Sequence, residues 1–68
     1  MVAVSSEAIR EIDYDAKAHA LRVRFTDGDW YRYFEVPPRV AGDFLSAPSH
    51  GRFFQAHIRD RYPYWRER

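Results

Sequence analysis

The chain has 68 residues, a formal net charge of +1 and no cysteine. This length provides one small core, since a second domain needs roughly 100 residues of its own. The absence of Cys excludes disulfides, thiolate metal ligands and thiol nucleophiles. Aromatic residues make up 18% of the chain, and their large buried area is the expected substitute for cross-links. The chain has no apolar run of membrane-spanning length and no secretory signal, so we expect a cytoplasmic location.

Three extended segments are predicted along the first half of the chain. Residues 1–6 either lie along a sheet edge or are loose, and a first strand follows over about residues 8–14. Strict alternation of apolar and charged side chains predicts a half-buried strand over residues 21–25. Residues 30–34 form a third, aromatic strand, and the intervening Asp27-Gly28 is typical of a hairpin. These segments predict a three-stranded antiparallel meander.

The turn of this hairpin decides which side chains face the core. A two-residue turn pairs Val23 with Arg32 and places a charge within the apolar face. A three-residue loop, with Gly28 in the left-handed conformation, pairs Val23 with Tyr31 instead. We favour the second register because it buries no arginine, and a slip of one residue would invert every face. The face away from the core then collects Arg22, Arg24, Trp30, Arg32 and Phe34.

Two short helices are predicted after the sheet. Pro37-Pro38 ends the third strand and suits the first turn of a helix over residues 38–46. Ala47-Pro48 stops that helix, and Ser49 is a suitable cap for a second helix over roughly residues 50–58. The predicted fold is therefore α+β, a three-stranded antiparallel meander with two short helices packed on one face.

The C-terminal end is extended by Pro63, and it either packs back on the core or projects. We expect residues 65–68 to form a loose tail, and residues 1–68 to form a single domain. The predicted core consists of Ile12, Leu21, Val23, Phe25, Tyr31, Tyr33, Phe44, Phe54, Ile58 and Tyr62.

An ordered set of residues resembles the KTSC domain family over nearly the whole chain. The set comprises Ser5-Ser6, Ile9, Ile12, Tyr14-Asp15, Leu21, Val23, Phe25, Gly28, Tyr31, Tyr33, Val36-Pro37, Val40, Leu45, Ala47, Ser49, Gly51, Phe54, Ile58 and Tyr62-Pro63-Tyr64. The family is named after the C-terminal extension of some lysyl-tRNA synthetases. The resemblance implies a small α+β domain for which nucleic-acid binding has been proposed, without an established catalytic activity.

The chain departs from the pattern of that family at three places. Asp13 stands where Gly is common, and Gln55 stands where Asn is common. Arg59-Asp60 replaces a common Lys-Gly, which keeps one positive charge and adds a negative one.

Basic residues gather towards the C-terminus, and ten of the eleven are Arg. Residues 1–49 hold six basic and eight acidic side chains, a sum of −2, whereas residues 50–68 hold five and two, a sum of +3. Arginines among aromatic rings suit phosphates and stacked bases. We therefore predict a nucleic-acid-binding surface, for RNA or DNA, made of Arg22, Arg24, Trp30, Arg32, Arg52, Arg59 and Arg61.

Metal binding and catalysis are not expected. His50 and His57 are seven residues apart, and zinc sites need tighter groups of ligands. The serines lack a nucleophile-elbow context, so no metal, cofactor or catalytic residue is predicted. The alternative function is a protein-interaction or self-association module, such as a homodimer, that uses the exposed sheet edge and the aromatic face. No membrane partner is expected.

Overall fold

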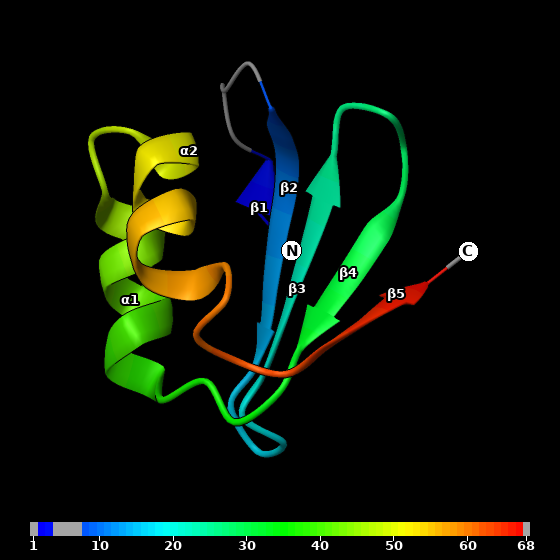
Figure 1. Ribbon diagram of the computed structural model, residues 1–68. Helices are drawn as coiled ribbons and strands as arrows, with labels where there is room; N and C mark the ends of the chain where they lie inside the picture. The colour runs from blue at the N-terminus through cyan, green and yellow to red at the C-terminus, as the bar shows by residue number, and fades with distance from the viewer. Residues whose placement is uncertain (1, 4–7, 68) are drawn as a thin grey trace.

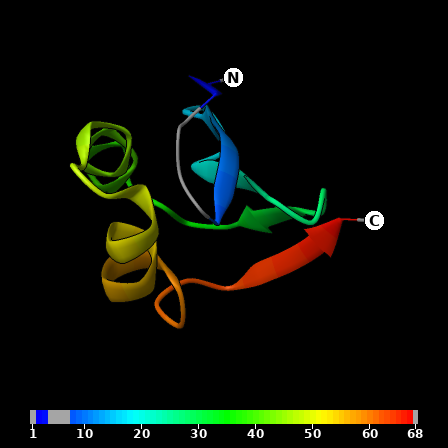
Figure 2. The ribbon, with the colours of Figure 1, turned by 90° about the horizontal axis from the view of Figure 1, so that it is seen from above.

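The computed structural model describes residues 2–3 and 8–67. One antiparallel sheet has the strand order β1-β2-β3-β4-β5, and the helices lie together on one of its faces (Figures 1 and 2). The elements are β1 (Val2–Ala3), β2 (Ile9–Asp15), β3 (Ala20–Phe25), β4 (Trp30–Tyr33), α1 (Pro38–Ser46), α2 (His50–Phe53), the π-helix η1 (Phe54–Ile58) and β5 (Tyr64–Glu67). The predicted α+β class with two helical segments on one face is confirmed. The predicted number of three strands is wrong, because β5 and the two-residue β1 extend the meander at its edges.

The β3–β4 hairpin adopts the three-residue loop that buries no arginine. Val23 pairs with Tyr31, as predicted. The Phe25 backbone NH donates to the Asp29 carbonyl at 3.0 Å, and Gly28 has a φ of 95°. The predicted register is confirmed, and it fixes which side chains of the meander face the helices.

The C-terminal segment is a strand rather than a loose tail. Residues 64–67 pair antiparallel with β4, with Trp65 opposite Arg32. The Phe34 backbone NH donates to the Pro63 carbonyl at 2.9 Å and starts this pairing. The prediction of a loose tail is therefore wrong for residues 65–67, and residue 68 lies outside the described residues.

Of the predicted N-terminal segment 1–6, the structure describes residues 2–3. Residues 2–3 pair with β2 as the edge strand β1, which is the sheet-edge alternative. The rest of the predicted segment 1–6 lies outside the described residues.

The helices begin and end where the sequence signals stand. α1 has Pro37 at its N-cap and Ala47 at its C-cap, and the hydroxyl of Ser49 caps α2 by accepting from the Arg52 backbone NH. The predicted second helix consists of the α-helical segment α2 followed by the π-helical segment η1. Its last five residues form η1, which closes when the Arg59 backbone NH donates to the Phe54 carbonyl at 2.9 Å. Within the described residues, no helix has the length and hydropathy needed to cross a membrane.

The core lies between the sheet and the helices. Seven of the ten predicted core residues are buried, namely Ile12, Leu21, Val23, Tyr33, Phe44, Phe54 and Ile58. Phe25, Tyr31 and Tyr62 are partly buried and pack against them. The sequence prediction omitted four buried residues, which are Ile9, Ala20, Val36 and Ala41. Tyr14 joins the layers because its hydroxyl donates to the Val36 carbonyl at 2.6 Å.

Candidate nucleic-acid interface

The outer face of the sheet, which points away from the helices, carries the first predicted group of binding residues. Side chains of directly paired residues share a face of the sheet, and the pairing places these arginines beside acidic residues of β2 and β5. We call this surface the outer face; its residues are Glu11, Asp13, Arg22, Arg24, Trp30, Arg32, Trp65 and Glu67. Three arginines and three carboxylates give it a formal charge of zero.

Each arginine of the outer face meets at least one carboxylate. Arg24 Nη1 lies 2.9 Å from Glu11 Oε1, and Arg22 Nε lies 3.0 Å from Glu67 Oε1. Arg32 Nη2 lies 3.6 Å from the second oxygen of Glu67. The sequence prediction missed the role of Glu67 because this residue fell within the expected loose tail. A phosphate on this face would have to compete with these carboxylates.

The two tryptophans of the outer face differ in accessibility. The guanidinium carbon of Arg22 lies 4.4 Å from the centre of the Trp30 ring, so one face of that ring is already covered. Trp65 is 68% exposed. The sequence prediction had assigned it to the loose tail, so it was not included among the residues of this face. Trp65 is therefore the most accessible ring of the outer face.

The second predicted group lies on the opposite side of the molecule, after or within the helical segment. Arg52, Arg59 and Arg61, here called the helix-side arginines, are all exposed. Within residues 8–67, none of the three forms an ion pair. Arg59 Nη1 donates to Gln55 Oε1 at 2.9 Å. The structure therefore separates the seven predicted residues into two groups, one on each side of the sheet.

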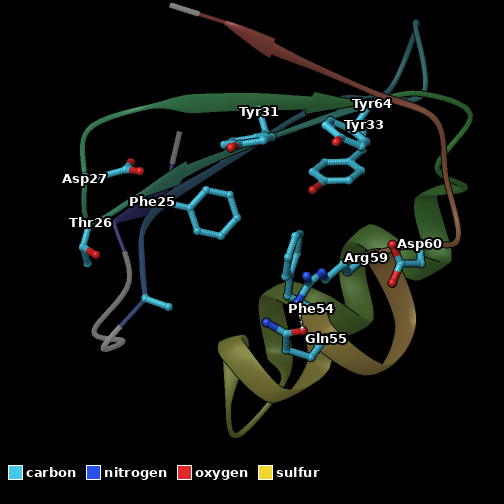
Figure 3. Close-up of a pocket in the computed structure, with 11 residues that line it drawn as sticks. Phe25, Thr26, Asp27, Tyr31, Tyr33, Phe54, Gln55, Arg59, Asp60 and Tyr64 are labelled. Carbon is cyan, nitrogen blue, oxygen red and sulfur yellow. Dashed lines mark hydrogen bonds between the residues drawn. The ribbon is translucent and has the colours of Figure 1, made fainter.

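An open cavity of about 470 Å³ lies between the sheet and η1. Its aromatic lining comes from three strands and η1, and consists of Phe25, Tyr31, Tyr33, Phe54 and Tyr64 (Figure 3). Phe54 is the central contact, with its ring centre 5.3 Å from that of Phe25 and 5.5 Å from that of Tyr33. Single π-helical turns are frequent at functional sites. We call this space the aromatic cavity.

Polar groups lie at two ends of the aromatic cavity, with Thr26 and Asp27 at the hairpin loop and the others on the helix side (Figure 3). They are Thr26, Asp27, Gln55, Arg59 and Asp60. Burial, together with the nearby Tyr31 and Tyr64, raises the pKa of Tyr33 to about 12, so this phenol stays neutral at physiological pH. The cavity thus combines aromatic surfaces with hydrogen-bond donors and acceptors. Within the described residues, no three His, Asp or Glu side chains gather closely enough to hold a metal ion.

Comparisons with known proteins agree with this architecture. The model of the KTSC domain family matches residues 5–62. The chain belongs to this family. A KTSC domain protein from Yersinia pestis has a crystal structure that covers 98% of this chain and 94% of its own, with a TM-score of 0.93 and 35% identity.

Relatives of the KTSC chain occur alone and within a longer enzyme. An uncharacterised protein of Stutzerimonas stutzeri is 42% identical over 96% of this chain and 93% of its own length. A lysine–tRNA ligase of Nostoc punctiforme is 36% identical over 82% of this chain, which corresponds to 10% of the ligase. This chain is therefore similar to nearly the full length of one small protein and to a short segment of a much larger enzyme.

The backbone explains one departure from the usual KTSC pattern. Asp60 has a φ of 64°, in the left-handed region that Gly adopts without steric cost. Asp is one of the few other residues that tolerate this conformation. The common Gly at this place is thus a backbone requirement, and Asp60 meets it while adding a carboxylate to the aromatic cavity.

Proposed function

We propose that the protein is a non-enzymatic accessory module that binds single-stranded nucleic acid through the helix-side arginines and the aromatic cavity. The observation that carries this proposal is the contrast between the two groups of arginines. The helix-side arginines are exposed and have no carboxylate partner in residues 8–67, and Arg59 lies beside accessible aromatic rings. The arginines of the outer face are already paired with carboxylates.

Single strands are favoured by the kind of contacts that this surface offers. Guanidinium groups bind phosphates with their planar forks, and aromatic side chains stack on unpaired bases with about 1–3 kcal/mol per base. A duplex keeps its bases stacked internally and offers only phosphates to such a surface. The similarity to a segment of lysine–tRNA ligases supports an RNA ligand, because that enzyme is named for a tRNA substrate.

The test compares two triple variants with the same change of charge. Arg52→Gln, Arg59→Gln and Arg61→Gln together lower the formal net charge from +1 to −2, and so do Arg10→Gln, Lys17→Gln and Arg39→Gln. All six side chains are exposed. Titration of labelled single-stranded RNA over a range of salt should show that only the first variant loses about tenfold or more in affinity. Its log–log salt slope should fall by about two, since three phosphate contacts contribute ~0.7 each.

Other outcomes would contradict the proposal. Equal losses in both variants would show that overall charge, rather than the helix-side arginines, drives binding. A larger loss in the variant Arg22→Gln, Arg24→Gln and Arg32→Gln, with its fold intact by circular dichroism, would return the binding site to the outer face.

A second candidate function rests on the outer face and the edge of β5. Trp65 is 68% exposed there, among alternating positive and negative side chains. Only one edge of β5 is paired within the described sheet, so its remaining backbone groups are suited to strand addition. These features favour self-association or the binding of a protein partner, and they leave the helix-side arginines free.

A further inference from the structure

We infer that the aromatic cavity holds one unstacked nucleobase of the bound strand and prefers bases that carry an exocyclic amino group. This inference rests on the proposed function and adds a base preference to it. The helix-side arginines alone would bind any phosphate chain, whereas the aromatic cavity provides a place in which one base is distinguished from another.

The size and lining of the cavity suit a flat ring. Its volume of about 470 Å³ falls within the roughly 300–1,000 Å³ of typical small-molecule sites. Tyr64 is 60% exposed and its ring centre lies 5.8 Å from Tyr31 and 5.6 Å from Tyr33. Figure 3 shows these sheet tyrosines on one side of the cavity and Phe54 on the other. Tyr33 and Phe54 are buried and already pack edge-to-face, so a base in the cavity stacks on the exposed Tyr64 and the half-buried Tyr31.

The polar groups of the cavity supply acceptors for an amino group. The carboxylate of Asp60 makes no hydrogen bond or ion pair within residues 8–67. Asp27 uses Oδ1 to accept from the Asp29 backbone NH at 2.9 Å, which leaves Oδ2 available. Carboxylates accept from the exocyclic amino group of cytosine. Uracil presents a carbonyl oxygen at the same position, and the carboxylate of Asp60 opposes that acceptor.

Gln55 and Arg59 limit the site from the helix side. The side-chain oxygen of Gln55 is engaged by Arg59, so its amide NH₂ remains as a donor. Arg59 lies between this amide and Asp60 (Figure 3). Because Arg59 lines the cavity, we expect its remaining donors to meet the phosphate of a strand whose base is inside. The geometry therefore couples base insertion to the phosphate contacts of the helix-side arginines.

The test uses two RNA ligands that differ at one functional group of the base. Short oligocytidylate and oligouridylate of equal length carry an amino group and a carbonyl, respectively, at the same ring position. We expect the wild-type protein to bind oligocytidylate at least about fivefold more tightly, which is the lower end of the discrimination of one good base contact. In Asp60→Asn this ratio should fall towards one, because an amide offers a donor as well as an acceptor, and Asn tolerates the left-handed conformation.

Adjacent residues of β5 provide matched controls for the position of the base. Tyr64 and Trp65 are similarly exposed, at 60% and 68%, and point to opposite faces of the sheet. Tyr64→Ala should weaken oligocytidylate binding about fivefold or more, whereas Trp65→Ala should leave it unchanged, with both folds checked by circular dichroism. The reverse result would place base stacking on the outer face and overturn the inference.

An oligomer of abasic sugar phosphates separates the inference from the proposed function. Equal, salt-dependent affinity for oligocytidylate, oligouridylate and the abasic strand would overturn the base site and leave phosphate binding by the helix-side arginines intact. A lack of binding to all three at low salt would overturn the proposed function itself.

Discussion

Within the part of the chain that the structure describes, three residues other than glycine have backbone angles that most side chains avoid. His19, Glu35 and Asp60 have φ values of 52°, 60° and 64°, and this region costs an ordinary L-residue about 1–2 kcal/mol. Asp60 lies in the aromatic cavity, where its side chain has a proposed role. Glu35 is exposed and lies between the sheet and α1, outside the aromatic cavity. The proposed binding site therefore does not explain its strained backbone conformation.

Replacing Glu35 by Gly should therefore stabilise the protein. The gain from removing the strained Cβ exceeds the loss of about 0.5–1 kcal/mol from the greater freedom of Gly in the unfolded chain. We expect the free energy of unfolding in urea to rise by about 0.5–1 kcal/mol. Glu35→Ala is the control, because it removes the charge and keeps the Cβ. An equal gain in both variants would attribute the effect to the charge.

Tyr33 makes the stability of the protein sensitive to alkaline pH. Burial raises its pKa from the usual value near 10 to about 12 in the folded protein, so the unfolded chain releases this proton first. The folded state is consequently favoured below pH 10, and this contribution is lost as pH rises from 10 to 12. Urea unfolding at pH 8 and 11 should show a decrease in stability that is smaller in Tyr33→Phe. An identical decrease in the variant would assign the effect to other groups.

At the level of whole elements, local signals were sufficient for part of the fold. The β3–β4 hairpin and α1 form where Asp27-Gly28 and Pro37-Pro38 predict them, because turn and cap chemistry acts within a few residues. β5 could not be predicted in this way. It is short, it follows Pro63, and its pairing partner β4 lies about 30 residues earlier in the chain, so no local pattern identifies that partner.

The missed strand also explains why the candidate site was only partly predicted. The alternation of β3 and β4 correctly placed Arg22, Arg24 and Arg32 on one face, but Glu67 reaches them only because β5 extends the sheet. The aromatic cavity combines residues from β3, β4, β5 and η1. Residues such as Tyr64 and Gln55 are assembled by tertiary structure, so their proximity carries no signal in the spacing of the sequence.

For the molecule as a whole, the net charge of +1 conceals two surfaces with different properties. The outer face combines opposite charges with an exposed tryptophan beside the β5 edge, which is a pattern suited to contact between copies. In sedimentation experiments with increasing protein concentration, we expect a dimer to appear, and Trp65→Ala should reduce its population. A monomer throughout the micromolar range would contradict self-association through this face.

The order of strands in the sheet has a consequence for how the protein folds. β2, β3 and β4 are joined by short turns, so they meet with little loss of chain entropy, whereas β5 can pair only after the whole helical segment has closed a long loop. We therefore expect early folding to produce a meander in which the aromatic side chains do not yet contact Tyr64. The last strand to be added completes both the sheet and the wall of the aromatic cavity. We therefore expect fraying of this C-terminal strand to open the cavity in the folded protein.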